Sequence, residues 1–329
     1  MYRRGIGLYP EVGCTISKPH IFHWSRRVFL TLFLMENLSS LFSQFCDYKL
    51  SLEGNTPRTI KWFHEVFTLF QKQTGIENPA ELTSGSLECW ILNGRKNGDW
   101  SNRTIRGRIQ VFRLFLDWSV KRGYHSHNFA RDMKLPRIQH RIRPRLDREQ
   151  ALSLLDWTNR IPFRRKFERH RAMAVIAIFL FSGIRRSELL KLEISDVRLS
   201  EGQLAIRSGK CDKDRLIPIH PRLHFVLSRY LEQRNELNYQ CSSLIVSTIS
   251  DKGLSLRALR RLLEKIRKFS GIPFSAHMLR HTFATLMIES GANIYSLQQM
   301  MGHSSIQTTT IYLSSTTKML KNDMEKLHL

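Results

Sequence analysis

Apolar residues return every three or four positions through residues 36–74, and this spacing predicts two helices. Thr56 followed by Pro57 opens the second helix, because proline suits the first helical position. Its core-facing stripe consists of Ile60, Phe63, Phe67 and Phe70. A further helix is predicted from about residue 102 to 122, and its inward positions are Ile105, Ile109, Phe112 and Leu116. Residues 35–130 are therefore expected to form a small all-helical domain.

The pattern breaks at residues 131–147, which are strongly basic and contain Pro136 and Pro144. Proline fixes φ and removes a backbone donor, so no continuous helix is expected there. The basic residues of this stretch are Arg131, Lys134, Arg137, Arg141, Arg143 and Arg145. We interpret it as an extended linker that can lie along a polyanion.

Residues 148–329 form the second predicted domain. The almost wholly apolar run from Met173 to Ser182 predicts a buried helix. Alternation from Leu204 to Ile219, around a polar stretch at 208–214, predicts a β-hairpin. A later helix has an apolar side of Leu256, Leu259, Leu263 and Ile266 and a basic side of Arg257, Arg260, Arg261, Lys265 and Lys268. The expected fold class is mainly α with a small β-sheet in the second domain.

The charge balance narrows the class of partner. The 329 residues include 52 Lys and Arg against 28 Asp and Glu, a formal net charge of +24. Such a charge repels itself unless a polyanion screens it, so nucleic acid or an anionic membrane surface is the expected partner. A hydrophobic share of 42% fits a folded soluble protein and excludes a disordered tail protein or a membrane bundle.

The cysteines and the first 34 residues predict a cytoplasmic protein. Five cysteines, odd in number and far apart, favour free thiols in a reducing compartment. The apolar run from Val28 to Leu34 is too short for a bilayer, which needs about 20 residues in a helix. No small-residue cleavage site follows it, as a signal peptide would require. We interpret residues 1–34 as an N-terminal extension or a mis-assigned start.

Several catalytic motifs do not occur in the sequence. It has no G-x-x-x-x-G-K-[ST] phosphate loop, no H-E-x-x-H zinc motif and no G-x-S-x-G nucleophile elbow. Carboxylates are scarce in the second domain, so no pair of magnesium ions is expected. His277 and His281 stand four residues apart, a spacing at which two histidines can bind zinc, but the sequence shows no third zinc ligand. The sequence therefore predicts no metal and no cofactor.

What remains is an ordered series of cations and one tyrosine. The run S-G-I-R-R-S-E-L-L from Ser182 opens one helix, and S-A-H-M-L-R-H from Ser275 opens another, with Ser275 as its N-cap. G-H-S follows at residues 302–304, and Tyr312 comes nine residues after His303. Each piece alone has an ordinary structural explanation, such as a surface arginine or a packed tyrosine.

Together, G-I-R-x-S-E-L, a hairpin lysine, H-x-x-R-H-T-F-A-T, G-H-S and a downstream tyrosine resemble the tyrosine recombinase family, the phage-integrase type that includes the Xer proteins. The resemblance runs from about residue 36 to the end and is looser in the N-terminal part. It implies a two-domain, C-shaped DNA clamp, with a helical core-binding domain at 35–130 and a catalytic domain at 148–329. The implied catalytic residues are Arg185, Lys210, His277, Arg280, His303 and Tyr312, supported by Glu188.

The resemblance also implies what these residues do. Arg185 and Arg280 would hold the scissile phosphate, since guanidinium forks match two phosphate oxygens, and His303 would add a hydrogen bond. Tyr312 would attack phosphorus and give a 3′-phosphotyrosyl enzyme, with His277 as proton acceptor. The exchange of one phosphoester for another of similar energy needs neither metal nor ATP.

Two positions stay open. Lys210 would protonate the departing 5′-oxygen, but the hairpin reads G-K-C-D-K where the family usually has G-K-G, so Lys213 is an alternative acid. Arg186 is an alternative to Arg185, although the motif favours Arg185. Two other functions are also compatible with the sequence, a DNA-binding accessory protein that no longer cleaves and a type IB topoisomerase.

The expected partner is double-stranded DNA on the nucleoid, with four copies of the chain on two paired recombination sites. The residues expected to contact DNA are Arg103, Arg106, Arg137, Arg141, Arg143, Arg257, Arg260, Arg261 and Lys265. The helix around residues 257–268 is the candidate for the major groove. The amphipathic segment Lys318 to Leu329 either packs on its own domain or docks into a neighbouring subunit.

Overall fold

The computed structural model describes residues 37–98, 100–138, 144–207, 214–302 and 309. The chain divides into two compact units, residues 1–140 and 141–329, and each is described by itself. The division falls within the segment 131–147. Several predicted functional residues lie outside the described residues, namely Lys210, Lys213, His303, Tyr312, Arg141 and Arg143, as do the segments 1–34 and 318–329.

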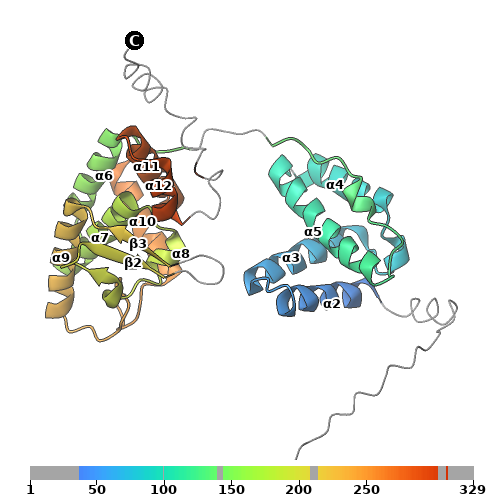
Figure 1. The fold of residues 1–329 in the computed structure, drawn as a ribbon, viewed down its shortest axis with the longest axis horizontal. Coiled ribbons are helices and arrows are strands. Elements are labelled where there is room, and N and C mark those ends of the chain that lie inside the picture. The colour runs from blue at the N-terminus through green and yellow to red at the C-terminus, as the bar shows by residue number, and fades with distance from the viewer. Residues whose placement is uncertain (1–36, 99, 139–143, 208–213, 303–308, 310–329) are drawn as a thin grey trace, which may run out of the picture. The chain divides into compact units, whose positions relative to one another are not determined.

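In the described part of the first unit, four helices pack into one bundle (Figure 1). They are α2 (Leu38–Ser51), α3 (Pro57–Thr74), α4 (Ser84–Gly98) and α5 (Asn102–Lys121), with short 3-10 turns at Pro79–Glu81 and Phe129–Arg131. The predicted start of α3 is confirmed, because the Thr56 side chain accepts a hydrogen bond from the Thr59 N–H and Pro57 is the first helical residue. Helix α4 was not among the predicted helices.

The core of the first unit is built from aromatic rings. Phe42 of α2 stacks on Phe67 of α3 with ring centroids 4.0 Å apart. Phe112 of α5 lies 4.8 Å from Phe70 and 5.7 Å from Trp90. Offset and edge-on pairs of this kind stabilise a core beyond the area that they bury. The predicted apolar stripes of α3 and α5 therefore face each other across this core, as the spacing required.

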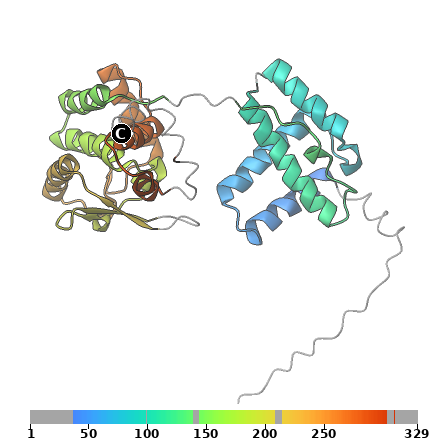
Figure 2. The same cartoon turned by 45° about the horizontal axis from the view of Figure 1, so that its top comes forward.

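Helix α7 (Lys166–Ser182) is the centre of the second unit. It packs against α6 (Arg148–Arg160), α9 (Pro221–Glu236) and α11 (Ala276–Glu289). Figure 2 shows these helices from a second direction. Residues 174–180 are all buried, so the predicted buried helix is confirmed, and it begins earlier than predicted, at Lys166.

A small antiparallel sheet, in the order β1-β2-β3, completes the fold. Its strands are β1 (Val197–Arg198), β2 (Gln203–Ile206) and β3 (Arg215–Pro218). Leu204 pairs with Ile217, and both are buried, which confirms the predicted hairpin and adds β1 to it. The remaining helices of the described part are α8 (Arg186–Leu189), α10 (Leu256–Ser270) and α12 (Ile294–Met301), with a 3-10 turn at Ile194–Asp196.

Helix α10 presents the predicted basic face to solvent. Leu259 and Ile266 are buried as predicted, but Leu256 is 38% exposed and Leu262 is buried. Leu256 is the first residue of α10. The helix reaches the core about one turn later, at Leu259. Among the described residues, no helix is long and apolar enough to cross a bilayer.

Candidate active site

Distant parts of the second unit meet at the C-terminal end of α12. The last turn of a helix leaves its carbonyls without helical partners and carries the negative end of the helix dipole. Here three consecutive carbonyls each accept a hydrogen bond from a different arginine, one from β3, one from α11 and one from the residue before α8. The bonds are Arg215 Nε to Met300 O (2.7 Å), Arg280 Nη2 to Met301 O (2.7 Å) and Arg185 Nη2 to Gly302 O (2.8 Å).

Arg280 also links this point to the end of α7. Its side chain is almost wholly buried, at 3% exposure for the residue, and its Nη1 donates to Gly183 O at 2.7 Å. Gly183 has a left-handed φ of 60°, and a Cβ there would stand 2.2 Å from the Phe283 ring, so only glycine fits this turn. Backbone carbonyls orient the Arg280 guanidinium without neutralising its charge.

Glu188 is the carboxylate of the cluster, and its side chain is 9% exposed. Oε1 accepts from Arg185 Nη1 at 2.9 Å and from Arg215 Nη1 at 3.1 Å. Oε2 accepts from the Arg185 backbone N–H at 2.6 Å and from Arg215 Nη2 at 2.9 Å. Burial alone raises the pKa of Glu188, but these bonds outweigh burial and hold the pKa below its ordinary value. Glu188 is therefore ionised at neutral pH.

The four side chains together have a surplus of positive charge. Arg185, Arg215 and Arg280 contribute three positive charges and Glu188 one negative charge, so 3 − 1 gives a formal charge of +2. The Arg185 side chain is 35% exposed, so it is the most accessible of the ion-paired side chains in the cluster. Guanidinium groups bind phosphate oxygens through paired N–H donors. The arrangement can therefore bind a phosphate group and stabilise added negative charge on it.

The structure thus brings together three of the predicted site residues, Arg185, Glu188 and Arg280. Predicted His277 lies exposed in the first turn of α11, and its ring centroid is 4.3 Å from that of His281. Ser275 caps this helix as predicted, accepting from the Met278 N–H at 3.2 Å. In the part of the chain that the structure describes, no group of three or more His, Cys, Asp or Glu residues could hold a metal ion.

Arg215 belongs to the cluster but was not predicted from the sequence. It follows the polar stretch 208–214 directly, and its side chain is 7% exposed. On β3, Arg215 and buried Ile217 alternate with Leu216 and Pro218, which are exposed. The alternation of inward and outward side chains along β3 could have identified Arg215 from the sequence. A cation on the inward face of a strand needs a carboxylate partner.

The predicted DNA contacts have different surroundings. Arg257, Arg260, Arg261 and Lys265 are all exposed on α10. Arg103 and Arg137 are exposed in the first unit. Half-buried Arg106 donates to Pro136 O at 3.3 Å, and Arg113 donates to three carbonyls of the segment 130–133. Helix α5 thus fixes residues 130–137 to the first unit.

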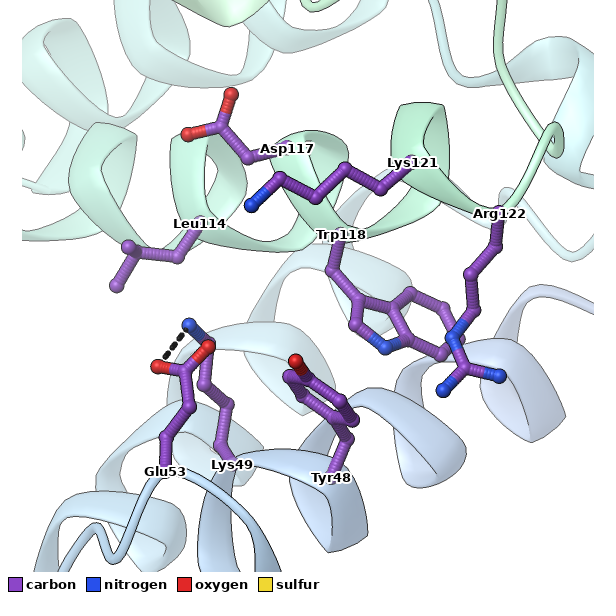
Figure 3. Close-up of a pocket in the computed structure, with 8 residues that line it drawn as sticks. All are labelled: Tyr48, Lys49, Glu53, Leu114, Asp117, Trp118, Lys121 and Arg122. Atoms are coloured by element: carbon purple, nitrogen blue, oxygen red, sulfur yellow. Dashed lines mark hydrogen bonds and ion pairs between the residues drawn. The ribbon is translucent and has the colours of Figure 1, made fainter.

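The first unit contains a hollow of about 510 Å³ between α2 and α5 (Figure 3). Arg122 lies over the rings of Trp118 and Tyr48, at 5.1 and 5.4 Å from their centroids. Lys49 and Glu53 form an ion pair at 2.6 Å on the opposite wall. Three cations and two carboxylates line this hollow, so 3 − 2 gives a formal charge of +1, smaller than the +2 of the arginine cluster.

Known proteins match the chain in sequence and in fold. The sequence profile of the phage integrase family matches residues 144–319. The tyrosine recombinase XerA of Thermococcus kodakarensis is 31% identical over 298 residues, which are 90% of this chain and 98% of that protein. A Tn1549 transposon integrase in complex with transposon right end DNA has a TM-score of 0.70 at 19% identity, covering 87% of this chain and 99% of its own. A lambda integrase tetramer bound to a Holliday junction has a TM-score of 0.67 at 17% identity, covering 87% of this chain and 80% of its own.

Proposed function

The chain belongs to the phage integrase family, and on that premise we propose that the arginine cluster at the end of α12 is the active site of a site-specific DNA recombinase. Tyrosine recombinases are enzymes that break and rejoin DNA. The observation that supports this placement is the convergence of three arginines on three consecutive carbonyls beside one buried carboxylate. Neither a non-cleaving accessory protein nor a type IB topoisomerase is favoured by the relatives.

In the proposed site, Arg185 and Arg280 hold the scissile phosphate. Both guanidiniums are fixed by backbone carbonyls, so they need little reorganisation when the phosphate arrives. Their charges oppose the extra negative charge that develops on the non-bridging oxygens in the transition state. His303, which follows Gly302 directly in the sequence, adds a hydrogen bond to the same oxygens.

The proposed chemistry is a transesterification at phosphorus. The Tyr312 hydroxyl oxygen forms a bond to phosphorus, the bond to the 5′-oxygen breaks, and the products are a 3′-phosphotyrosine and a free 5′-hydroxyl. A free tyrosine has a pKa of roughly 10, so His277 accepts the phenolic proton and the surrounding cations favour the phenolate. Lys210, with Lys213 as the alternative, gives a proton to the departing oxygen. Rejoining is the reverse reaction with another strand, so the energy of the bond is kept.

The protein acts on double-stranded DNA. Most of the binding comes from phosphate contacts and falls steeply with salt concentration. The exposed basic face of α10 enters a major groove, and its arginines read base edges there. We place this activity on the nucleoid.

Four copies of the chain act together on two sites in this proposal, as in the lambda integrase tetramer. A groove of about 540 Å³ in the second unit offers a docking surface for a neighbouring copy. Its apolar lining includes Leu152, Phe181, Ile217, Phe283 and Met287. The segment Lys318 to Leu329 of a neighbour supplies matching apolar residues, Met319, Leu320, Met324 and Leu327.

Covalent capture tests the function directly. The protein is incubated with sheared genomic DNA from its own source, and DNA that stays attached after denaturation is sequenced. We expect recovery of one class of site with inverted repeats, and no recovery with Tyr312→Phe, which lacks the nucleophile. Capture by Tyr312→Phe at the level of the unaltered protein would contradict the proposal. Relaxation of any supercoiled plasmid, without a specific site, would favour the topoisomerase instead.

A further inference from the structure

Arg215 has no part in the chemistry described above, yet its guanidinium bonds both to Glu188 and to the end of α12. Nη1 and Nη2 donate to the two carboxylate oxygens at 3.1 and 2.9 Å, and Nε donates to Met300 O at 2.7 Å. We propose that Arg215 is a positioning residue, which fixes Glu188 and through it holds Arg185 against the scissile phosphate. This inference rests on the proposed function.

The bonds form a closed ring through the site. Arg215 holds Glu188, and Glu188 holds the Arg185 side chain and its backbone N–H. Arg185 in turn holds Gly302 O, two residues after the carbonyl that Arg215 itself holds. Removing one member therefore loosens the other side chains, because each has its orientation set by two neighbours.

The bonds of Arg215 set its role apart from that of the two phosphate-binding arginines. Both of its terminal nitrogens donate to the Glu188 carboxylate and its Nε donates to Met300 O, so its charge is paired, whereas the equally buried Arg280 donates to the backbone carbonyls of Gly183 and Met301. The backbone also approaches closely, since a Cβ on Gly302 would stand 2.8 Å from Arg215 Nη1. Arg215 is thus bonded to the groups that orient Arg185, and in this proposal it acts on the substrate only through them.

A lysine at this position cannot do the same. The guanidinium fork binds both oxygens of Glu188 and a carbonyl at once, whereas an ammonium is a point charge on a flexible chain. Arg215→Lys keeps the charge and loses the geometry. The variant therefore separates a requirement for position from a requirement for positive charge.

The test compares two substrates that differ in the negative charge that Arg185 has to stabilise. One is a nicked duplex that carries the captured site with an ordinary scissile phosphate. The other has a methylphosphonate there, in which a methyl group replaces one charged non-bridging oxygen. We expect Arg215→Lys and Arg215→Gln to form the covalent complex about 100-fold more slowly on the phosphate. On the methylphosphonate the loss should be several-fold smaller, because less charge has to be stabilised.

The ratio of the two rates is measured on one preparation, so partial unfolding lowers both rates equally and cancels. Arg171→Gln is the matched control, because Arg171 is also a buried arginine of this unit and donates to Val246 O at 3.0 Å. It lies 12 residues before Gly183 along α7, about 18 Å at the rise of a helix. Its ratio should equal that of the unaltered protein.

A second comparison tests the route through Glu188. If Arg215 acts through this carboxylate, adding Arg215→Lys to Glu188→Gln should slow cleavage of the phosphate little further. Equal losses on both substrates, no loss at all, or full additivity with Glu188→Gln would each overturn the inference. Failure of the unaltered protein to form any adduct would instead overturn the proposed function, and this inference with it.

Discussion

At the scale of single residues, the stability of the second unit depends on one ionised carboxylate, Glu188, which is bonded to two arginines. Glu188 accepts four hydrogen bonds from Arg185 and Arg215, and these more than compensate for its burial. Breaking a buried ion pair by removing one partner is costly, because the other charge stays buried without compensation. The same contacts that orient the site therefore also stabilise the fold.

We expect Glu188→Gln to lower the free energy of unfolding of the second unit by about 3 kcal/mol near neutral pH. The pKa of Glu188 is lowered in the folded protein, so its contribution is fully present above the pKa of the unfolded side chain, roughly 4.3, and is lost as the pH falls through the folded value. Thermal unfolding of both proteins as the pH is lowered measures this. The difference in Tm should shrink below about pH 4, and a difference that stays constant would contradict the role given to Glu188.

At the scale of elements, α10 is the helix that we propose to read DNA. Its core side is held by Leu259, Leu262 and Ile266, so the basic side faces solvent along the whole helix. Lys265 is exposed and its Nζ lies 4.1 Å from the centroid of the Phe163 ring, and Arg257, Arg260 and Arg261 are exposed as well. Exposed arginines are the side chains that form bidentate contacts with guanine.

We expect Arg260→Ala to weaken binding to the captured site by about 5-fold or more, since a bidentate base contact contributes about 1–3 kcal/mol. Binding to unrelated DNA should fall less, because only the phosphate attraction is reduced. Fluorescence anisotropy at one fixed salt concentration measures both affinities. Arg229→Ala on α9 is the control, since it removes the same residue type from another helix and the Arg229 side chain is 58% exposed. An equal loss on both DNAs would show that α10 contacts only the backbone.

The elements themselves were largely predictable, because caps and apolar spacing are local signals. Ser275 is the N-cap that the sequence predicted, and Pro57 is the first residue of its helix as predicted, with Thr56 as the cap. Helix α4 was missed because it contains three glycines, which weaken the helical pattern. Two of them serve packing, since a Cβ on Gly94 or Gly98 would stand 2.3 or 2.7 Å from the Trp100 ring. Trp100 lies outside α4, so the sequence of the helix alone could not show why these glycines are needed.

At the scale of the whole molecule, the candidate site joins residues that are more than a hundred positions apart. The order of the motifs pointed to Arg185, Glu188 and Arg280, and the structure places them around one helix end. Their mutual bonds were not predicted, because they run through the carbonyls of residues 300–302, which only the tertiary fold brings near, and through Arg215, which stands outside the motifs that carry the resemblance. The two-unit DNA clamp stays a prediction, as do the roles of Lys210, His303 and Tyr312.

The assembly of several copies on DNA is also a property of the whole molecule. We expect a chain ended after Thr317 to bind single sites with unchanged affinity but to pair them poorly, because the segment proposed to fill a neighbour's groove is gone. Gel mobility of a complex holding two sites measures the pairing, and sedimentation measures the number of copies. A full-length Lys321→Ala variant, which keeps the apolar side of the segment, should pair sites normally. Intact pairing by the truncated chain would contradict docking in a neighbouring subunit.

The central claim is that a tyrosine is joined to DNA beside the arginine cluster. The most direct measurement is mass spectrometry of the covalent complex after digestion with a protease and a nuclease. The account predicts one modified peptide, with a nucleotide linked through its 3′-phosphate to Tyr312, and no such peptide from Arg185→Ala at matched time. A nucleotide attached to another residue, or cleavage without any attached nucleotide, would contradict it.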